Sequence, residues 1–500
     1  MAGLLGVAFQ APYLDYAALA PELILTGVLV AVLLIDLFVG EDRKAVVAQV
    51  AGVGLLASLL PIAFLAADGA DRSMFSGAYV VDDFALVLKA LFLVSGYVVL
   101  LMSTDHVQEG DYWKGEYYFL LLSSVLGMVV MCSSRDLLSI FVALELLSIP
   151  AYLLAGWRKR DLRSNEASLK YYLLGVLSSA VMLYGMSLVF GATGTTVLAD
   201  IGAELGQAES SESLVALGIF FVVVGFAFKV SAVPFHFWAP DTYEGAPTPV
   251  TAFLSVASKA AGFVALLQLV FVGFFAQSDV WQPLFWFLAA LTMTVGNLVA
   301  LRQTNVVRLL AYSSVAQAGY MLVPFAVGGA SEVAAGTAQT AAIVYLLIYA
   351  AMNLGAFAIV MAVARKTRSG EISSYGGLFS YAPGLTVLMT VFLFSLAGIP
   401  PLGGWFAKLY IFKSAIDAGT GWAVTLAVVA GVNSVVALFY YASVAREMWM
   451  RPVPDGDLTP IPVPPALGAA LGITAAAVVA IGVYPQAFAR LGDLAQLPVR

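Results

Sequence analysis

Fourteen long apolar stretches constrain this chain more than any other feature of its sequence. Each holds about 18 or more mostly apolar residues in succession, which is the length a helix needs to cross a bilayer. They lie near residues 17–39, 46–67, 81–104, 116–133, 137–157, 167–192, 214–240, 249–275, 281–301, 306–328, 335–364, 385–417, 421–445 and 465–486. Because lipid offers the backbone no hydrogen bonds, such stretches predict helices. The expected fold is an all-α polytopic membrane protein with about 14 transmembrane helices.

The composition supports this fold class and excludes several functions. Hydrophobic residues make up 61% of the 500 residues and charged residues 11%, whereas a soluble domain has about 25% charged residues. One cysteine, Cys132, and two histidines, His106 and His236, are too few or badly placed for an iron–sulfur cluster, a haem or a zinc site. The net charge of −7, without a long basic run, argues against nucleic acid. We therefore expect no cofactor, metal or redox centre in this chain.

Basic residues are divided unevenly between the two sides of the predicted membrane. The connections after odd-numbered spans hold fourteen of them, and the connections after even-numbered spans hold two, Arg72 and Arg135. Because positive charges stay on the cytoplasmic side, the larger group marks that side. We expect a multi-pass protein of the bacterial plasma membrane with both termini on the outer side. The acidic segment 202–213, which has no basic residue, is expected to be an outer loop.

With Arg308, the third residue of span 10, counted among the connections, every basic residue inside the predicted spans is a lysine. The six are Lys89, Lys170, Lys229, Lys259, Lys408 and Lys413. A buried lysine can lose its proton, whereas arginine stays charged, and both are expensive to place inside a membrane. Lysine as the only basic residue type within the spans is typical of a membrane protein that exchanges protons.

Two buried charges lie well inside their spans. Glu145 has about eight apolar residues on either side, so burying it charged would cost several kcal/mol. We interpret it as a proton-handling group; the alternative is a structural ion pair. Lys229 precedes Pro234 and Pro240, which break the helix and free carbonyls that must line a cavity or be covered by protein. A lysine beside a broken helix is typical of an ion site, and a snorkelling lysine is the alternative.

A second interrupted span carries another lysine. Lys408 lies in SLAGIPPLGGWFAKLYIF, where proline and glycine pairs break an overlong stretch. Each of the two broken helices thus has a lysine within eight residues of the break. Paired interruptions of this kind indicate inverted repeats. Lys259 lies about ten residues into span 8, among small residues that permit close helix packing.

The remaining ionisable residues leave alternatives open. Lys170 follows Glu166 by four residues and could simply pair with it. His236, two residues beyond Pro234, is either a proton relay or a polar cap for the freed carbonyls. The residues expected to reach solvent near span ends are Lys89, Lys413, Glu22 and Asp36.

Three long motifs resemble one family of membrane proteins. In chain order they are FKVSAVPFHFWAPDTYEGAPTPVTAFLSVASKAAGF, QTNVVRLLAYSSVAQAGY and SLAGIPPLGGWFAKLYIF. Together they look like the proton-translocating membrane family shared by respiratory complex I and the Mrp-type cation/proton antiporters. The similarity extends over about residues 80–450. Three separate motifs in the right order argue strongly against a chance match.

Within this family the chain resembles the N-type branch of the bacterial NADH:quinone oxidoreductase subunits. The segment from Asp241 to Pro247 is similar to that branch rather than to the L, M and Mrp types. A lysine at position 408 fits the N or L type better than the M type. Gln317 departs from the pattern, because many N-type proteins have a histidine there, so no histidine relay through span 10 is predicted.

The resemblance implies which residues move protons and how the chain is divided. The implied site residues are Glu145 in span 5, Lys170 in span 6, Lys229 in span 7, Lys259 in span 8 and Lys408 in span 12. The implied units are three N-terminal helices in 1–110, one five-helix repeat in 115–278, a second, inverted repeat in 281–449, and a last helix with its tail in 450–500.

The hypothesis that follows is a buried Glu145–Lys229 pair whose making and breaking changes the proton affinity of the lysine. Protons would then pass to Lys259 and Lys408. FMN, iron–sulfur clusters and the quinone site are expected in partner subunits, and K-, M- and L-type membrane subunits and lipid are the expected neighbours. The alternatives are a subunit of an Mrp-type sodium/proton antiporter and a structural scaffold whose lysines only hold helices together.

Overall fold

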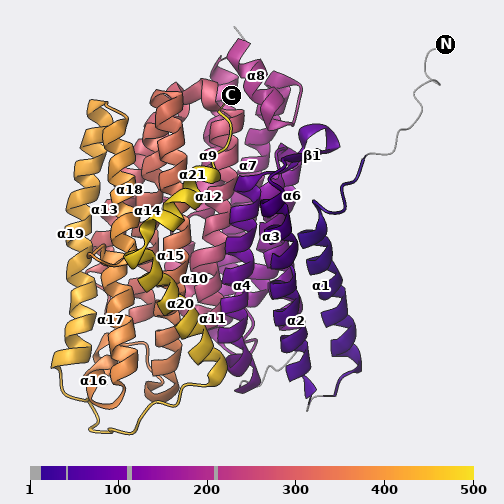
Figure 1. Ribbon diagram of the computed structural model, residues 1–500. Helices are drawn as coiled ribbons and strands as arrows, with labels where there is room; N and C mark the ends of the chain where they lie inside the picture. Colours follow the sequence, from indigo (N-terminus) through magenta and orange to yellow (C-terminus); the bar gives the residue numbers. More distant parts are fainter. Residues whose placement is uncertain (1–12, 41–42, 110–114, 208–211, 500) are drawn as a thin grey trace.

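The computed structural model describes residues 13–40, 43–109, 115–207 and 212–499. Within these ranges the chain is a bundle of long, roughly parallel helices (Figure 1). Lys114, which counts among the fourteen basic residues on the predicted cytoplasmic side, and residues 208–211 of the predicted acidic loop lie outside the described residues.

Twelve predicted spans correspond to helices that are long and apolar enough to cross a membrane. They are α1 (Ala20–Phe38), α2 with α3 (Ala45–Ala57, Leu59–Asp68), α4 (Asp83–Glu109), α5 (Glu116–Ser133), α6 (Leu137–Ala155), α7 (Leu162–Thr193), the run α11, η3, α12 and η4 (Thr248–Phe253, Leu254–Ser258, Lys259–Gln268, Leu269–Gly273), α13 (Ser278–Ala300), α14 (Val306–Val327), α15 (Glu332–Thr367), α19 (Gly421–Met450) and α20 (Pro465–Val483).

The other two predicted spans are split where the sequence predicts breaks. One consists of α9 (Glu212–Lys229) and α10 (Trp238–Gly245), and the other of α17 (Pro383–Ala397) and α18 (Gly403–Asp417). The prediction of an all-α polytopic fold with two discontinuous helices is therefore confirmed.

Short elements connect the long helices or follow the last of them. They are β1 (Arg72–Met74), η2 (Phe75–Gly77), β2 (Tyr79–Val81), α8 (Leu198–Gln207), η5 (Phe275–Gln277), η6 (Gly328–Ala330), η7 (Ile372–Tyr375), α16 (Leu378–Tyr381) and α21 (Pro485–Leu494). The strands β1 and β2 pair antiparallel with Arg72 opposite Val81. No pattern in the sequence predicts this ribbon, because three-residue strands are too short for an alternating pattern. The segment 202–213 was predicted to be a loop, but α8 occupies its first residues.

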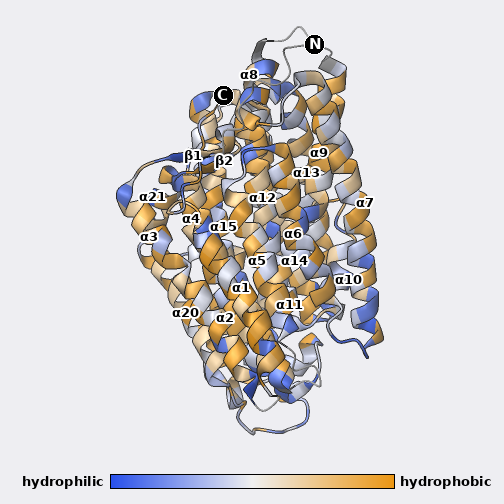
Figure 2. Ribbon diagram, turned by 90° about the vertical axis from the view of Figure 1, so that its right-hand side faces the viewer, coloured by the Kyte–Doolittle hydropathy of each residue, from blue (hydrophilic) through white to orange (hydrophobic). Residues whose placement is uncertain are grey.

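Burial separates central from peripheral helices. In the run from α11 to η4, every residue of the most apolar 18-residue window is buried, whereas α1, α7 and α19 bury 28% of theirs. Figure 1 shows α19 and α1 at opposite edges, and in Figure 2 apolar residues dominate the long helices while polar colours gather near their ends. Helices whose outer faces are apolar fit a lipid or subunit surface. Lys259 thus lies on the most buried helix.

Capping and close packing fix the helices that carry the site. The Asp136 side chain accepts hydrogen bonds from the backbone N–H groups of Leu138 and Ser139 and starts α6, and Asn305 caps α14 in the same way. Glycines allow near backbone contact between helices: a Cβ added at Gly127 of α5 would lie 2.6 Å from the Leu147 nitrogen of α6. Such small residues are typical of helix pairs in membranes.

Candidate functional site

The first helix break lies directly after Lys229, the last residue of α9. The Phe228 carbonyl accepts a hydrogen bond of 2.9 Å from the Trp238 indole N–H. The Val233 N–H donates to Thr292 Oγ1 of α13 at 2.9 Å. These backbone groups are therefore satisfied by protein, as membrane depth requires.

The second break presents its carbonyls to functional side chains. The Lys408 Nζ of α18 donates to the Ala397 carbonyl at 2.7 Å, and the Gln317 Nε2 of α14 donates to the Leu396 carbonyl at 3.0 Å. The Gly404 N–H donates to Ser395 Oγ at 3.0 Å, which ties the two halves together. A lysine and an amide thus occupy positions that intrahelical N–H groups would fill in a continuous helix.

Lys229 is 3% exposed and contacts hydroxyl groups rather than a carboxylate. Its Nζ donates to Ser148 Oγ of α6 at 2.8 Å and to the Tyr171 hydroxyl of α7 at 3.3 Å. Glu145 instead accepts a 2.6 Å hydrogen bond from Ser179 Oγ of α7.

The predicted Glu145–Lys229 pair is therefore not formed in this conformation, in which the described residues hold no ion pair between the two, and its making and breaking stays a prediction. The reason is local: the partly exposed Glu145 accepts its hydrogen bond from Ser179 of α7, whereas the buried Ser148 accepts the one from Lys229. Because Glu145 and Ser148 are three residues apart on one helix, they share a face and the two contacts are neighbours.

Lys259 is 1% exposed and is held by α14. Its Nζ donates to Ser314 Oγ at 2.5 Å and to the Ser314 carbonyl at 2.7 Å. The Tyr349 hydroxyl of α15 donates to the same Ser314 Oγ at 2.8 Å. One turn further along α12, a Cβ added at Gly262 would lie 3.2 Å from Lys229 Cγ. The helix of Lys259 therefore packs directly on Lys229.

Lys408 is 3% exposed, and its Nζ lies 4.7 Å from the centre of the Tyr320 ring. Gln317 lies three residues before Tyr320, so both side chains are on one face of α14. Besides its bond to the second break, Gln317 donates to the Tyr441 hydroxyl at 3.3 Å and accepts from the Tyr345 hydroxyl. Helix α14 thus contacts Lys259 through Ser314 and Lys408 through Tyr320.

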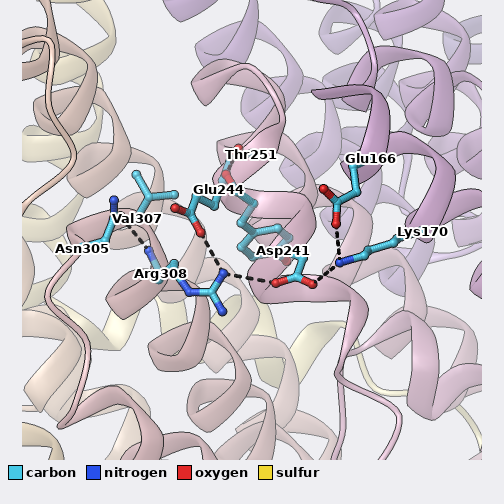
Figure 3. Close-up of polar contacts among 9 residues, drawn as sticks. Glu166, Lys170, Asp241, Glu244, Thr251, Asn305, Val307 and Arg308 are labelled. Carbon is cyan, nitrogen blue, oxygen red and sulfur yellow. Dashed lines mark hydrogen bonds and ion pairs between the residues drawn. The ribbon is translucent and has the colours of Figure 1, made fainter. Parts of the chain in front are cut away.

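Lys170 belongs to a cluster of charges rather than to the buried series. Its Nζ lies 2.8 Å from Glu166 and 2.7 Å from Asp241, and 42% of its side chain is exposed. Arg308 lies 3.1 Å from Asp241 and 2.7 Å from Glu244. Figure 3 shows the alternation of acid and base from Glu166 to Glu244. We call these five residues the ionic cluster.

A cavity of about 220 Å³ opens beside the ionic cluster, whose five side chains line it together with Arg163. The i,i+4 pair of Lys170 with Glu166, which the sequence left as an alternative, is present. The role of Lys170 in proton transfer stays a prediction.

His236 lies between the two halves of the first broken helix and is 6% exposed. Among the described residues its Nδ1 has no hydrogen-bond partner. The ring centre lies 4.6 Å from that of Phe237 and 6.4 Å from that of Tyr312. A relay role for His236 stays a prediction.

Two expectations about span ends are wrong. Lys89 is fully buried, and its Nζ lies 2.6 Å from Glu22, whose side chain is 9% exposed. Neither residue reaches solvent in this chain, because α1 and β2 cover the lysine and Glu22 offers it a counter-ion. Asp36 likewise pairs with Lys44 at 2.6 Å. Lys413, by contrast, is 57% exposed beside Asp417, as expected.

Sequence reasoning missed several polar residues of the site. Asp241 was noticed only as part of a motif and Arg308 only as a basic residue in a connection. Ser314 and Tyr349 carried no signal, because a serine or tyrosine in an apolar stretch is common. Among the described residues, no group of three or more His, Cys, Asp or Glu side chains is placed to hold a metal.

The fold and the site together define a polytopic membrane protein with two interrupted helices and a lysine beside each break, the architecture of antiporter-like transport subunits. The profile of the NADH:quinone oxidoreductase/Mrp antiporter, TM family matches residues 134–434, so the chain belongs to that family.

Relatives within the family confirm the N-type resemblance. The chain is 42% identical over 468 residues to NADH-quinone oxidoreductase subunit N of Trichlorobacter lovleyi, covering 93% of each chain. Among solved structures it is similar to a chain of respiratory complex I from Thermus thermophilus with bound Aureothin, at 32% identity and a TM-score of 0.77, over 95% of this chain and 99% of that one. A chain of the Mrp complex from Dietzia sp. DQ12-45-1b shares the fold, with a TM-score of 0.83 at 23% identity over 97% of both chains.

Proposed function

We propose that this chain is a proton-translocating membrane-arm subunit of a respiratory NADH:quinone oxidoreductase. One observation carries the proposal: Lys229, Lys259 and Lys408 are each at most 3% exposed, and the hydrogen-bond acceptors of their amines are hydroxyl and carbonyl oxygens. A buried ammonium without a carboxylate beside it is expensive. Lysine, unlike arginine, can relieve that cost by releasing its proton.

The contacts of Lys229 suggest how its affinity for a proton is controlled. The lysine has a long, flexible side chain, and Glu145 lies one helical turn from its present acceptor Ser148. Rotation of the side chain would exchange the serine for the carboxylate. At about 4 Å and an effective dielectric near 20 such a pair is worth roughly 4 kcal/mol, enough to change which form of the amine prevails.

The order of contacts favours a lateral path through the middle of the bundle. Lys229 packs against the helix of Lys259, and α14 touches both Lys259 and Lys408. Where no direct bond joins two of these groups, water beside the broken helices would complete the path. The ionic cluster, at the end of the bundle where α10 meets α11, would be its entrance from the cytoplasm.

The chain itself would carry no redox centre. FMN, iron–sulfur clusters and quinone would be bound by partner subunits, and K-, M- and L-type membrane subunits would be its neighbours in the complex. The chain would lie in the bacterial plasma membrane with both termini on the outer side. The 42% identity to a subunit N over most of the chain favours this assignment over an Mrp antiporter subunit, for which only fold similarity speaks.

Charge-preserving substitutions test the proposal. Lys229→Arg and Lys259→Arg keep a cation in place but remove the ability to release a proton. In inverted membrane vesicles containing the whole complex, both variants should lower the number of protons moved per electron passed from NADH to quinone. Lys413→Arg is the matched control, because Lys413 is exposed and should keep the normal ratio.

The amount of assembled complex must be measured on a native gel for each variant. A normal proton-to-electron ratio in assembled Lys229→Arg and Lys259→Arg would refute the assignment of these lysines. Sodium-dependent transport by the chain without any electron transfer would favour the antiporter alternative instead.

A further inference from the structure

A buried carboxylate–lysine pair, Glu22 with Lys89, lies outside the two predicted repeats. Lys89 of α4 and Glu22 of α1 are 2.6 Å apart, with exposed fractions of 0% and 9%. The Tyr79 hydroxyl of β2 donates to the same Glu22 oxygen at 2.7 Å. The Lys89 Nζ also lies 5.5 Å from the centre of the Tyr79 ring. Three elements, α1, β2 and α4, therefore meet at one ion pair.

The pair has unused hydrogen-bonding capacity. Glu22 Oε2 has no hydrogen-bond partner among the described residues, nor has Ser133 Oγ at the end of α5. The Lys89 ammonium has three protons, and beyond its ion pair with one Glu22 oxygen its Nζ has no hydrogen-bond partner among the described residues. Buried polar groups of this kind are normally satisfied by protein or water. A site with several such atoms has the polar partners that a buried water molecule needs.

The surroundings of the pair contain other charges. Arg135, at the start of α6, lies 2.8 Å from Asp82 and donates to Gln268 Oε1 of α12 at 2.8 Å. The titratable and charged groups that face the Glu22–Lys89 pair from the neighbouring elements are Tyr79, Asp82, Cys132 and Arg135.

The position of the pair along the membrane differs from that of the other lysines. Lys89 lies six residues after Asp83, the first residue of α4, or about 9 Å from that end of the helix. Glu22 is the third residue of α1. The N-terminal ends of α1 and α4 lie beside the β1–β2 ribbon, which the distribution of basic residues assigns to the outer side of the membrane. The pair is thus one to two turns inside the outer end of the bundle.

Resting on the proposed function, we propose that Lys89 and Glu22 form a proton-exchange site that serves the outer face of the membrane. An ionisable pair buried in a membrane protein is a functional candidate by default, and this one has a flexible amine, a carboxylate with a free oxygen and a hydroxyl donor in contact. The ammonium gives one proton to the carboxylate, which leaves a neutral amine and a neutral acid. The acid then gives that proton to water on the outer side and becomes a carboxylate again. The amine then takes a proton from a hydronium ion on its inner side, which leaves a water molecule there and restores the ammonium.

A purely structural pair would behave differently under two substitutions. Replacing a buried ion pair by apolar side chains of similar volume is often neutral or stabilising. The triple variant Glu22→Met, Tyr79→Phe, Lys89→Met therefore removes the charges and the hydroxyl together while keeping the volume. Lys89→Arg keeps the charge and the pairing but cannot release a proton.

The test measures protons moved per electron in inverted vesicles containing the whole complex, with assembly checked on a native gel. We expect both variants to show a lower ratio than the unmodified complex, while Lys413→Arg keeps it. A full ratio in the assembled triple variant would overturn the inference. If little of the triple variant accumulates, Lys89→Arg decides: a reduced ratio supports a proton-exchange site, and a full ratio means that the pair only holds α1 against α4.

Lys229→Arg separates this inference from the proposed function. If Lys229→Arg lowers the proton-to-electron ratio and Lys89→Arg leaves it unchanged, the outer site is rejected and the proposed function is kept. A full ratio in both variants rejects the proposed function as well.

Discussion

Gly404, the second residue of α18, offers the sharpest test of the second helix break. A Cβ added there would lie 1.7 Å from the Ser395 carbonyl oxygen, whereas ordinary van der Waals contact begins at 3.4 Å. The carbonyl oxygen belongs to the backbone and the position of the Cβ is fixed by the backbone, so rotating a side chain cannot relieve the clash. Gly404→Ala must therefore push α17 and α18 apart at the point where Lys408 binds the Ala397 carbonyl.

The cost can be worked out from these contacts. Overpacking a well-packed site costs about 1–3 kcal/mol, and losing the hydrogen bond from the Gly404 N–H to Ser395 Oγ adds about 1 kcal/mol. We expect Gly404→Ala to lower the free energy of unfolding by about 2–4 kcal/mol. A change of about 2 kcal/mol corresponds to about a 30-fold change in the folding equilibrium. The assembled amount and the proton-to-electron ratio should both fall, because the acceptor of Lys408 is displaced.

Gly403→Ala is the matched control for this substitution. Its added Cβ would first meet the Ile481 and Ile348 side-chain methyl groups at 3.2 and 3.3 Å, and side chains can shift by a few tenths of an ångström. Thermal unfolding of the detergent-purified complex and vesicle proton pumping would compare the two. Equal stability and equal pumping in the two variants would show that the break is not held as tightly as these distances indicate.

Three further predictions follow from single contacts. Tyr349→Phe removes the hydrogen bond to Ser314 and should lower the proton-to-electron ratio in vesicles while costing about 0.5–1.5 kcal/mol of stability; an unchanged ratio would exclude the tyrosine from the path. Arg308→Ala breaks two half-exposed ion pairs worth about 0.2–1 kcal/mol each, so native gels should show normal assembly while turnover falls as the entrance is altered. The hydrogen bond from Arg72 holds the pKa of Asp15 below its ordinary value of 3.8. The contact between Asp15 and Arg72 therefore stabilises the folded chain fully above pH 3.8, and this stabilisation is lost as the pH falls through the lowered pKa. Backbone hydrogen exchange ahead of α1 should rise over that range, and should lose this dependence in Asp15→Asn.

Much of the fold follows from the sequence because the membrane imposes simple rules. An apolar stretch of bilayer length must become a helix, and proline and glycine pairs must interrupt it. These rules suffice for the fourteen spans and for both breaks, beside Lys229 and Lys408. They also single out the lysines that lie within the spans, because charge is so expensive in this environment that each instance stands out.

The partners of those lysines depend on how the helices are rotated and packed. The sequence places Glu145 in span 5 and Lys229 in span 7, and their opposite charges make a direct pair the simplest prediction. In the structure, however, Ser148 faces the lysine and Ser179 faces the glutamate. A rotation of one helix by a single residue position exchanges such contacts, and no pattern along one chain segment records that angle.

Residues near the ends of spans likewise show that burial depends on packing and not on the local sequence. Lys89 and Lys413 have similar local sequences, since each lies in an apolar stretch a few residues from aspartate. One is fully buried against Glu22 and the other is 57% exposed. The sequence by itself determined that this chain crosses a membrane with lysines inside it, because hydropathy and length are local properties. Only the tertiary structure decided which lysines are buried and which oxygen each amine meets, because burial and hydrogen bonding depend on helices distant in sequence.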